Sequence, residues 1–449
     1  MSKIFWPLLV GIFLIAACTQ DRMPELIALE VALEEAIENS AKRNGIDSYI
    51  LPSAQDLSDI PQDEVNNPLT PSKVELGKFL FFETGFATDA RRPEGMGTYS
   101  CASCHIPEAG FKPGSRQGIA DGGVGFGVNG EARRRSPAYI SPELDVQSAR
   151  PLSLVNVAFV KNTLWNGRFG AEGDNVGTEA YWKESDGTAM NALGFEAIET
   201  QNFEGLETHR IHITKDLIDN FGYTELFDAS FPDMEDDLKY SNHAGSLAIS
   251  AYIRTLLADR APFQEWLKGD NEAMTEEEKR GGLLFFGKAN CSNCHHQENL
   301  GSGEFHALGV KDIDDYAYFQ TTDAELLDRN LGRGSFTGLD SDMFRFKVPG
   351  LYNAGDANHF FHGSSALTLE DVVAYKNAAV TENDDIPQDQ LSDKFLSLNL
   401  SEEEQAHLVA FIKSALRDPD LPRYKPESIK SNLCFPNNDE DSKKDLGCQ

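Results

Sequence analysis

Basic residues are scarce in this chain, which has 40 lysines and arginines against 72 aspartates and glutamates among its 449 residues. The formal net charge of -32 repels nucleic acid and anionic lipid surfaces, so neither is expected as a partner. The charge favours a cationic partner, or it serves solubility alone. Proline and glycine are not in excess, and hydrophobic residues make up 40% of the chain, which is enough for two domains with cores of their own.

Long apolar runs are absent after the first residues, so no later segment is expected to cross a membrane. Residues 1–17 hold one lysine, a short apolar stretch and small residues before Cys18, a pattern typical of an export signal. Residues 15–18, Ile-Ala-Ala-Cys, resemble a bacterial lipobox, in which Cys18 is acylated and becomes the first mature residue. Thr19 favours delivery to the outer membrane; ordinary signal cleavage with an incidental Cys18 is the alternative. We therefore expect an exported periplasmic or cell-envelope protein with a soluble body, lipid-anchored at Cys18.

Cysteines are also few, seven in all, and without Cys18 the other six form three closely spaced pairs. Cys434 and Cys448 lie in a polar, acidic tail, residues 426–449. In an oxidising compartment this pair is expected to form a small disulfide, and two unrelated thiols are the alternative. The remaining four cysteines belong to a repeated motif.

An internal repeat organises most of the chain. Residues 73–82 predict an amphipathic helix ending in Leu-Phe-Phe, and Cys-Ala-Ser-Cys-His follows at 101–105. Residues 277–286 and the Cys-Ser-Asn-Cys-His at 291–295 repeat this order. Two repeats predict two similar domains, 71–262 and 263–425, preceded by a tether and one helix within 18–70. Strand signals are sparse and short, whereas the glycine-rich loops are long.

Cys-x-x-Cys-His is the attachment sequence of c-type haem. The two thiols add to the vinyl groups, and the histidine binds iron from beneath the porphyrin. Zinc would need four protein ligands at close spacing, and a redox dithiol needs no following histidine. The predicted attachment residues are Cys101, Cys104, His105, Cys291, Cys294 and His295, with His105 and His295 as proximal iron ligands. We therefore expect two covalently bound haem c groups in a mainly α fold: two cytochrome c-like domains with long loops and little strand.

The chain resembles the bacterial dihaem cytochrome c peroxidase family, which includes the enzymes that mature the tryptophan cofactor of methylamine dehydrogenase. The motifs that carry the resemblance are Leu76–Phe82, Ser100–His105, Leu164–Arg168, Gly282–Phe286, Phe346–Asn353, Phe361–Gly363 and Thr368–Val373. The resemblance implies that the N-terminal haem is the peroxide site and that the C-terminal haem receives electrons. Trp165 matches the family's tryptophan between the haems, where it would relay electrons or simply pack in the core.

Acid–base residues are expected after this tryptophan, beyond an apparent insertion at 170–193. Gln201 fits the family's glutamine best, and Glu207 is the preferred acid–base group because a carboxylate could move a proton between peroxide oxygens. His209 is the rival, and each of the three has a structural role as its alternative. Residues 106–208 contain no histidine, so the family's removable distal histidine has no counterpart there.

The second haem needs a sixth ligand, and the family's methionine is missing, because no methionine follows Met343. The matching position is Lys376, and Tyr375 lies beside it. Tyr375, Lys376 and Met343 are the candidates, with Tyr375 ranked first; an oxygen or amine ligand would lower the iron potential relative to sulfur. His362 is expected to support this haem by hydrogen bonding.

The resemblance also implies one calcium ion between the domains, although the matching segment, Ala149–Pro151, is altered and its asparagine ligand has no clear place.

The favoured function is reduction of hydrogen peroxide to water with electrons from a small donor protein, such as a basic cytochrome c. One alternative is a dihaem enzyme that uses peroxide to oxidise residues of a partner protein. Another is a non-enzymatic electron carrier in which both irons are six-coordinate. A homodimer is one candidate assembly, although the sequence does not give the oligomeric state.

Overall fold

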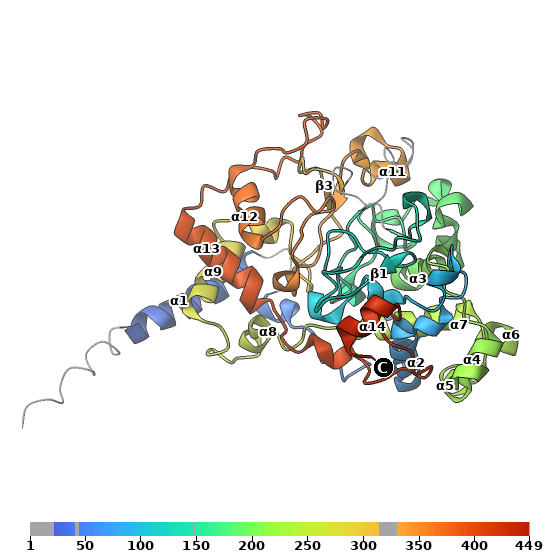
Figure 1. Cartoon of the computed structure of the whole chain (residues 1–449). Coiled ribbons are helices and arrows are strands. Elements are labelled where there is room, and N and C mark those ends of the chain that lie inside the picture. Colours follow the sequence, from blue (N-terminus) through green and yellow to red (C-terminus); the bar gives the residue numbers. More distant parts are fainter. Residues whose placement is uncertain (1–21, 41–44, 147–148, 314–329, 449) are drawn as a thin grey trace, which may run out of the picture.

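Helices carry most of the regular structure in this computed structural model, which describes residues 22–40, 45–146, 149–313 and 330–448 (Figure 1). The α-helices are α1 (Arg22–Asn39), α2 (Pro71–Phe82), α3 (Ala197–Thr208), α4 (Lys215–Phe221), α5 (Thr224–Ser230), α6 (Asp236–Lys239), α7 (Asn242–Arg254), α8 (Pro262–Leu267), α9 (Glu276–Phe286), α11 (Gly334–Thr337), α12 (Leu369–Ala378), α13 (Glu402–Ala410) and α14 (Glu440–Leu446). The strands β1 (Gly123–Val124), β2 (Arg134–Arg135), β3 (Phe305–His306) and β4 (Phe346–Lys347) form two antiparallel pairs, β1–β2 and β3–β4. The expected mainly helical fold with little strand is confirmed.

The two repeated helices begin in the same way. The side chain of Thr70 accepts a hydrogen bond from the backbone N–H of Lys73 and caps α2, and Pro71 takes the first helical position. Thr275 caps α9 by accepting from the N–H of Glu278, whose carboxylate accepts from the N–H of Thr275 at 2.7 Å. These caps satisfy backbone donors that a helix start leaves without partners, so both starts are fixed locally by sequence.

Each repeat then buries its helix against a second helix that crosses it at a glycine. A Cβ at Gly77 of α2 would overlap the carbonyl oxygen of Ala248 in α7. A Cβ at Gly281 of α9 would overlap the carbonyl oxygen of His407 in α13. Only glycine permits such close backbone approach, so the two domains share one packing design. The Leu-Phe-Phe ends of α2 and α9 lie in the core beside these crossings.

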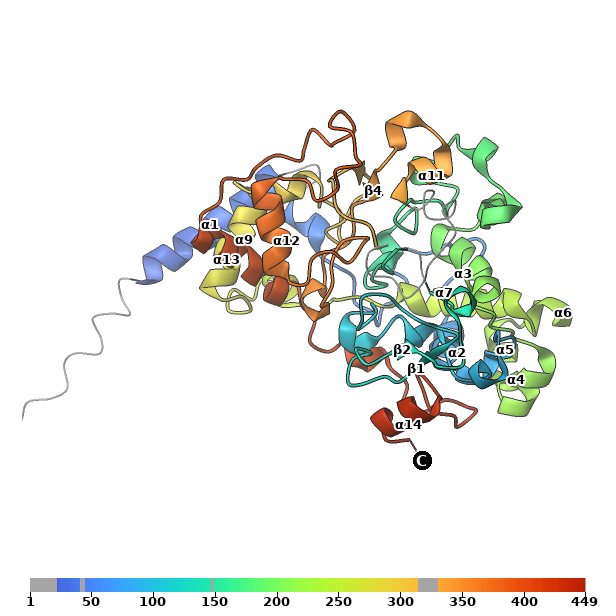
Figure 2. The ribbon, with the colours of Figure 1, turned by 45° about the horizontal axis from the view of Figure 1, so that its top comes forward.

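The two ends of the chain each pack on the domain that is more distant in sequence. Helix α1 lies along α9 in both views (Figures 1 and 2). Leu33 and Ile37 of α1 are fully buried, and Glu30 forms an ion pair with Lys279 and accepts a hydrogen bond from the indole of Trp266 at 2.7 Å. The N-terminal helix is therefore part of the second domain's core.

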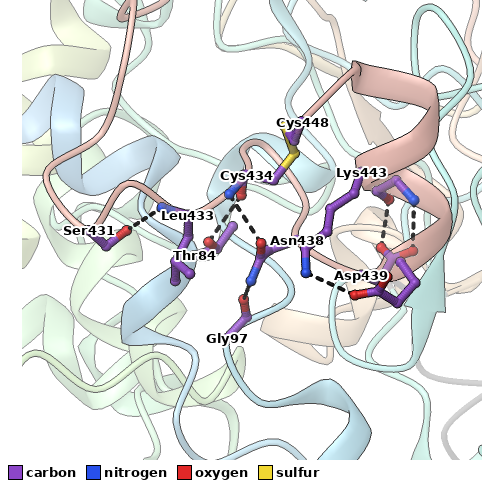
Figure 3. The surroundings of a disulfide bond; sticks show 11 residues. Thr84, Gly97, Ser431, Leu433, Cys434, Asn438, Asp439, Lys443 and Cys448 are labelled. Carbon is purple, nitrogen blue, oxygen red and sulfur yellow. Dashed lines mark hydrogen bonds and ion pairs between the residues drawn. A yellow bond between two sulfur atoms is a disulfide. The ribbon is translucent and has the colours of Figure 1, made fainter.

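The C-terminal tail packs in turn on the first Cys-x-x-Cys-His loop. Cys434 and Cys448, the pair expected from the sequence, form a disulfide, and Asn438 beside it bonds to the carbonyl of Gly97 at 3.1 Å (Figure 3). The hydroxyl of Ser100 donates to the carbonyl of Pro436 at 3.0 Å, and Ser103 donates to the same carbonyl at 3.2 Å. The tail therefore braces the loop that carries the first motif.

No helix in the described part of the chain is both long and apolar enough to span a membrane. The expected export signal, residues 1–17, and the lipid-anchor residue Cys18 lie outside the described residues.

Candidate haem sites

The first motif begins on a short 3-10 turn, Cys101–Ser103, and turns His105 into a buried pocket. Nδ1 of His105 donates a hydrogen bond to the carbonyl oxygen of Phe111 at 3.0 Å, which leaves Nε2 as the nitrogen available to a metal. Burial lowers the pKa of His105 to about 4, so the ring is neutral, as a metal ligand must be. The residues of this motif fit a c-type haem.

The second motif repeats this geometry on the turn Cys291–Asn293. Nδ1 of His295 donates to the carbonyl of Leu300 at 2.7 Å, and burial lowers the pKa of His295 to about 4. The two accepting residues, Phe111 and Leu300, both have left-handed backbones, with φ of 53° and 50°. That conformation is costly for a side chain other than glycine, and here it aims each carbonyl at the proximal histidine.

A cavity with about 730 Å³ of empty space, part of it open to solvent, adjoins the first motif. Cys101, Cys104 and His105 form one wall. Apolar side chains, including Phe81, Leu154, Ile249 and Ile253, form the sides. The space and its mixed lining suit a porphyrin, which is apolar at its faces and needs a fixed histidine at its iron.

Helix α3 contributes the polar residues to this cavity. Gln201, Gly205 and His209 follow one another at intervals of four residues, so they share the helix face that lines it. A Cβ at Gly205 would meet nothing within 4 Å, and the glycine therefore leaves open space at the middle of this face.

His209 is oriented by a carboxylate from a distant loop. Its Nδ1 donates to Asp145 Oδ2 at 2.8 Å, which leaves Nε2 for proton transfer, and its side chain is 34% exposed. Burial opposes its protonation, but the charge and hydrogen bond of Asp145 outweigh burial, so the pKa of His209 is raised. A histidine with a pKa above its usual range and a free ring nitrogen suits general acid–base chemistry near neutral pH.

A buried ion pair holds α3 in place above the cavity. Arg254 of α7 donates to both carboxylate oxygens of Glu199 in α3, at 2.9 and 2.6 Å, and both side chains are buried. Asn67 donates to the same carboxylate at 3.1 Å and joins the preceding connector to this pair. A bidentate, fully bonded pair fixes the rotation of α3 and therefore which of its residues face the cavity.

Trp165 lies where the two domains meet. Its ring centroid is 6.1 Å from that of His362 and 6.5 Å from that of Phe346, and Phe346 stacks on His362 at 3.6 Å. Its indole N–H donates to the carbonyl of Arg150 at 2.6 Å, and its own carbonyl accepts from the N–H of Lys347 in β4. Trp165 is thus fixed among residues of the second domain, as an aromatic relay or a core tryptophan would be.

Arg150 occupies the altered segment where the resemblance places calcium. Its guanidinium donates to the carbonyl oxygens of Ser115 at 2.7 Å and Pro113 at 2.9 Å, and burial lowers its pKa to about 9. The guanidinium of Arg150 therefore occupies backbone carbonyl oxygens of the kind that a calcium ion would use as ligands. The calcium ion stays a prediction, and the structure points to no asparagine ligand for it among these contacts.

The three candidates for the second haem's sixth ligand lie in different surroundings. Lys376 interacts electrostatically with Cys291 and Cys294, and so lies beside the second motif. The hydroxyl of Tyr375 donates to the carbonyl of Leu308 at 2.6 Å, and Met343 packs against Gly334 of α11. The preference for Tyr375 is therefore not supported by this geometry.

Comparisons with known proteins place these sites in a family. A family model described as di-haem cytochrome c peroxidase matches residues 71–272. Methylamine utilization protein MauG of Methylorubrum extorquens is 28% identical over 355 residues, which cover 79% of this chain and 80% of that protein. Cytochrome-c peroxidase IdrP1 of Denitromonas iodatirespirans is 28% identical over 393 residues, which cover 82% of this chain and 89% of that protein.

Residues 71–272 thus match the di-haem cytochrome c peroxidase family, and the relatives extend the similarity over 79% and 82% of the chain. These matches confirm the family resemblance expected from the sequence, an oxidoreductase of the cytochrome c peroxidase class, and a complement of two haems. Two haems agree with one haem for each Cys-x-x-Cys-His motif.

Solved structures support the fold alone. A MauG-like protein associated with microbial copper homeostasis aligns with a TM-score of 0.58 at 23% identity, covering 84% of this chain and 97% of that one. The dihaem peroxidase BthA of Burkholderia thailandensis aligns with a TM-score of 0.54 at 18% identity, covering 80% and 89%. The fold of the chain is therefore similar to that of these two proteins.

The structure corrects the choice of Glu207 as the acid–base residue. Glu207 lies two residues beyond Gly205, on the opposite side of α3, where it is exposed and accepts a hydrogen bond from Asn242 at 3.1 Å. It does not line the cavity, whereas Gln201 and its rival His209 do. His362 has the expected hydrogen-bonding role in part, since its ring pairs with Asp312 at 2.9 Å.

Sequence reasoning missed the role of Asp145 and of the pair formed by Glu199 and Arg254 in building the site. Asp145 reaches His209 across 64 positions of sequence from an irregular loop, and no local pattern announces it. Glu199 was visible as a charged residue at the start of α3, but its burial against Arg254 depends on helix packing.

Proposed function

We propose that this protein reduces hydrogen peroxide to water at its first haem, with electrons supplied by a small donor protein. The observation that carries the proposal is the cavity, which the first motif lines together with Gln201, Gly205 and His209, and which stays open at Gly205. A carrier would also need room for the porphyrin, but it would need a sixth ligand as well, and Gly205 offers no side chain at the middle of this face.

Cys101 and Cys104 would hold the first haem through thioether bonds, with Nε2 of His105 on the iron. When bound, this haem supplies an iron that takes up an oxygen ligand and delivers electrons to it. The same assignment for Cys291, Cys294 and His295 would hold the second haem covalently.

The chain's own residues supply the protons and the positioning. His209, held by Asp145, would accept a proton at Nε2 from one peroxide oxygen and return it to the other; two electrons from the donor and two protons from solvent complete the conversion of peroxide into two waters. The amide of Gln201 donates a hydrogen bond that orients the peroxide. Gly205 keeps the space between them clear of side-chain atoms.

Electrons would enter at the second haem and cross through Trp165. The ring of Trp165, with Phe346 and His362 beside it, forms an aromatic cluster joined by strand β4 to the second domain. The net charge of -32 would steer a basic donor, such as a cationic cytochrome c, to this protein. Turnover with such a donor should fall as ionic strength rises, and a salt-independent rate would contradict the steering.

The decisive experiment measures kcat/KM for peroxide with reduced cytochrome c on the haem-loaded protein. His209→Ala should lower kcat/KM by about 10²–10⁴-fold, the usual contribution of a positioned acid–base group. Glu207→Gln is the matched control on the same helix and should leave kcat/KM unchanged. Equal rates for wild type and His209→Ala, at unchanged haem content, would refute the role of His209.

A second variant keeps the test independent of proton transfer. Gly205→Val would project its side chain into the open part of the cavity, and we expect it to block peroxide while leaving the proximal motif unaltered. Stopped-flow mixing of Gly205→Val with peroxide should show a slowed change in the haem spectrum. An unchanged rate would show that peroxide does not use this cavity.

A second candidate function is peroxide-driven oxidation of residues in a partner protein. It is favoured by the relative named methylamine utilization protein MauG, and by the lack of any histidine in residues 106–208 that could close the first haem. An enzyme of this kind would form a long-lived oxidised state with peroxide but turn over poorly with small donors. Fast turnover with cytochrome c would exclude it.

We further propose that the protein is exported and lipid-anchored through Cys18, as the lipobox-like residues 15–18 indicate. Labelled fatty acid should enter the wild-type protein but not Cys18→Ser, and the variant should leave the membrane fraction. The expected homodimer stays a prediction that light scattering on the mature protein would test.

A further inference from the structure

Helix α12 presents one lysine on its inward face. Thr368 caps the helix by accepting from the N–H of Asp371, and Leu369 and Val373 are its buried residues. Lys376 follows Leu369 by seven residues and Val373 by three, so it lies on the same face as these two. A lysine in the buried stripe of a helix needs a partner for its charge or its nitrogen.

The ammonium of Lys376 lies beside the second haem motif. It interacts electrostatically with Cys294 and Cys291, and it affects His295 as well. A neutral amine carries a lone pair and can bind a metal.

Among the described residues, no hydrogen bond or ion pair satisfies this nitrogen, which lies 5.7 Å from the ring centroid of Phe395. The carboxylate of Glu304, which lies near the second motif, is bonded to Lys394 at 2.6 Å and to His306 at 2.9 Å. Lys376 is therefore a half-buried base with no acidic partner among the described residues, near two thiols and an imidazole that are arranged for a haem.

The competing side chains are already engaged. The ring of Tyr375 packs between Phe361 and Phe395, with centroids 5.5 and 5.4 Å away, and its hydroxyl is held by the carbonyl of Leu308. The sulfur of Met343 lies against Gly334 in α11.

We propose that the amine of Lys376 is the sixth ligand of the second haem iron, opposite His295. On binding, the ammonium loses its proton to solvent and the freed lone pair forms the nitrogen–iron bond, so nothing is oxidised or reduced. This inference rests on the second haem of the proposed function but not on peroxide turnover.

The ligand sets what kind of donor this haem can accept electrons from. A hard amine stabilises ferric iron more than a thioether sulfur does, so the second haem should have a lower potential than one with methionine in this place. The donor protein must then be more reducing than a donor that serves a methionine-ligated haem. Once reduced, this haem would be a stronger reductant toward the first.

The test is low-temperature electron paramagnetic resonance of the full-length, haem-loaded protein, with Lys376→Met and Tyr375→Phe as a matched pair of neighbours. Lys376→Met should replace the histidine–amine signal with a histidine–methionine signal and raise the reduction potential of the second haem. Tyr375→Phe should change neither. A signal altered by Tyr375→Phe and unaltered by Lys376→Met would overturn the proposal.

A measurement on unaltered protein covers the case in which a variant fails to fold or load haem. Wild type labelled with ¹⁵N-lysine should show hyperfine coupling between a lysine nitrogen and the second iron, and its absence would refute the ligand assignment. Poor peroxide turnover together with this coupling would count against the proposed function alone. Normal turnover without the coupling would count against the lysine ligand alone.

Discussion

The glycine crossings of the two helix pairs offer a direct test of the packing design. In the second domain, a Cβ at Gly281 would overlap the carbonyl oxygen of His407 and lie 2.7 Å from Cβ of Phe411. Both obstacles belong to the backbone, or stand directly on it, in α13 and the turn of π-helix that follows. Gly281→Ala therefore cannot be accommodated by rotating a side chain.

The loss of stability expected for Gly281→Ala depends on how far α9 and α13 must move apart. Relieving the overlap means separating α9 from α13 by about 1 Å, which weakens most van der Waals contacts along the crossing. Overpacking of this kind costs about 1–3 kcal/mol, and the upper end applies because backbone must shift. Alanine recovers about 1 kcal/mol through its higher helix propensity, so we expect a net loss of about 2 kcal/mol.

The assay is urea unfolding of the haem-loaded protein, followed by far-ultraviolet circular dichroism and by fluorescence of Trp266 at the base of the second domain. The adjacent Gly282→Ala is the matched control, because its Cβ would meet only movable side chains, Leu33 at 3.1 Å and Phe411 at 3.3 Å. We expect Gly282→Ala to unfold at nearly the wild-type midpoint. Gly281→Ala with an unchanged midpoint would refute the claim that the crossing needs glycine.

Other residues give shorter predictions. Glu199→Gln leaves the buried guanidinium of Arg254 without its counter-charge and should cost about 3–5 kcal/mol in urea unfolding; a loss below about 1 kcal/mol would contradict the structural role of this pair. Cys434→Ser opens a 14-residue loop and should cost about 3 kcal/mol, with a control in which reductant lowers the wild-type midpoint equally. Asp145→Asn removes the charge that raises the pKa of His209 against burial, so this pKa falls and the limb of the peroxidase pH profile set by His209 moves to lower pH. A limb that stays in place would show that another group sets it.

The sequence predicted what depends on short-range pattern. The two Cys-x-x-Cys-His motifs, the helices before them and the pairing of Cys434 with Cys448 are all readable because each is written in adjacent or regularly spaced residues. Trp165 was placed by its motif, and the structure puts it at the meeting of the domains.

The sequence did not show which of two nearby acid–base candidates, Glu207 or His209, faces the cavity. Glu207 and His209 are two residues apart, so which of them faces the cavity depends on the rotation of α3, and this is set by the pairing of Glu199 with Arg254 in another helix. For the second haem, the sequence did favour Lys376 over Tyr375 as the inward residue. Lys376 follows the buried residues Leu369 and Val373 at helical spacing, whereas Tyr375 does not.

The two domains hold their proximal histidines alike, so the difference between the sites must come from the opposite side of each cavity. On α3 the inward position between Gln201 and His209 is a glycine, and a face with a gap in it leaves room for an oxygen ligand. On α12 the inward position after Leu369 and Val373 is Lys376, a long side chain that ends beside the second motif. With the ligand proposed above, one glycine and one lysine, each on the inward face of a short helix, would give one fold an open site that reacts and a closed site that only passes electrons.

Removal of the proposed ligand should then turn the closed second site into an open one. Lys376→Gly should give the second haem a high-spin signal and access to small ligands such as cyanide. If both haems of that variant stayed low-spin and closed, the division between the sites would have to lie elsewhere in the fold.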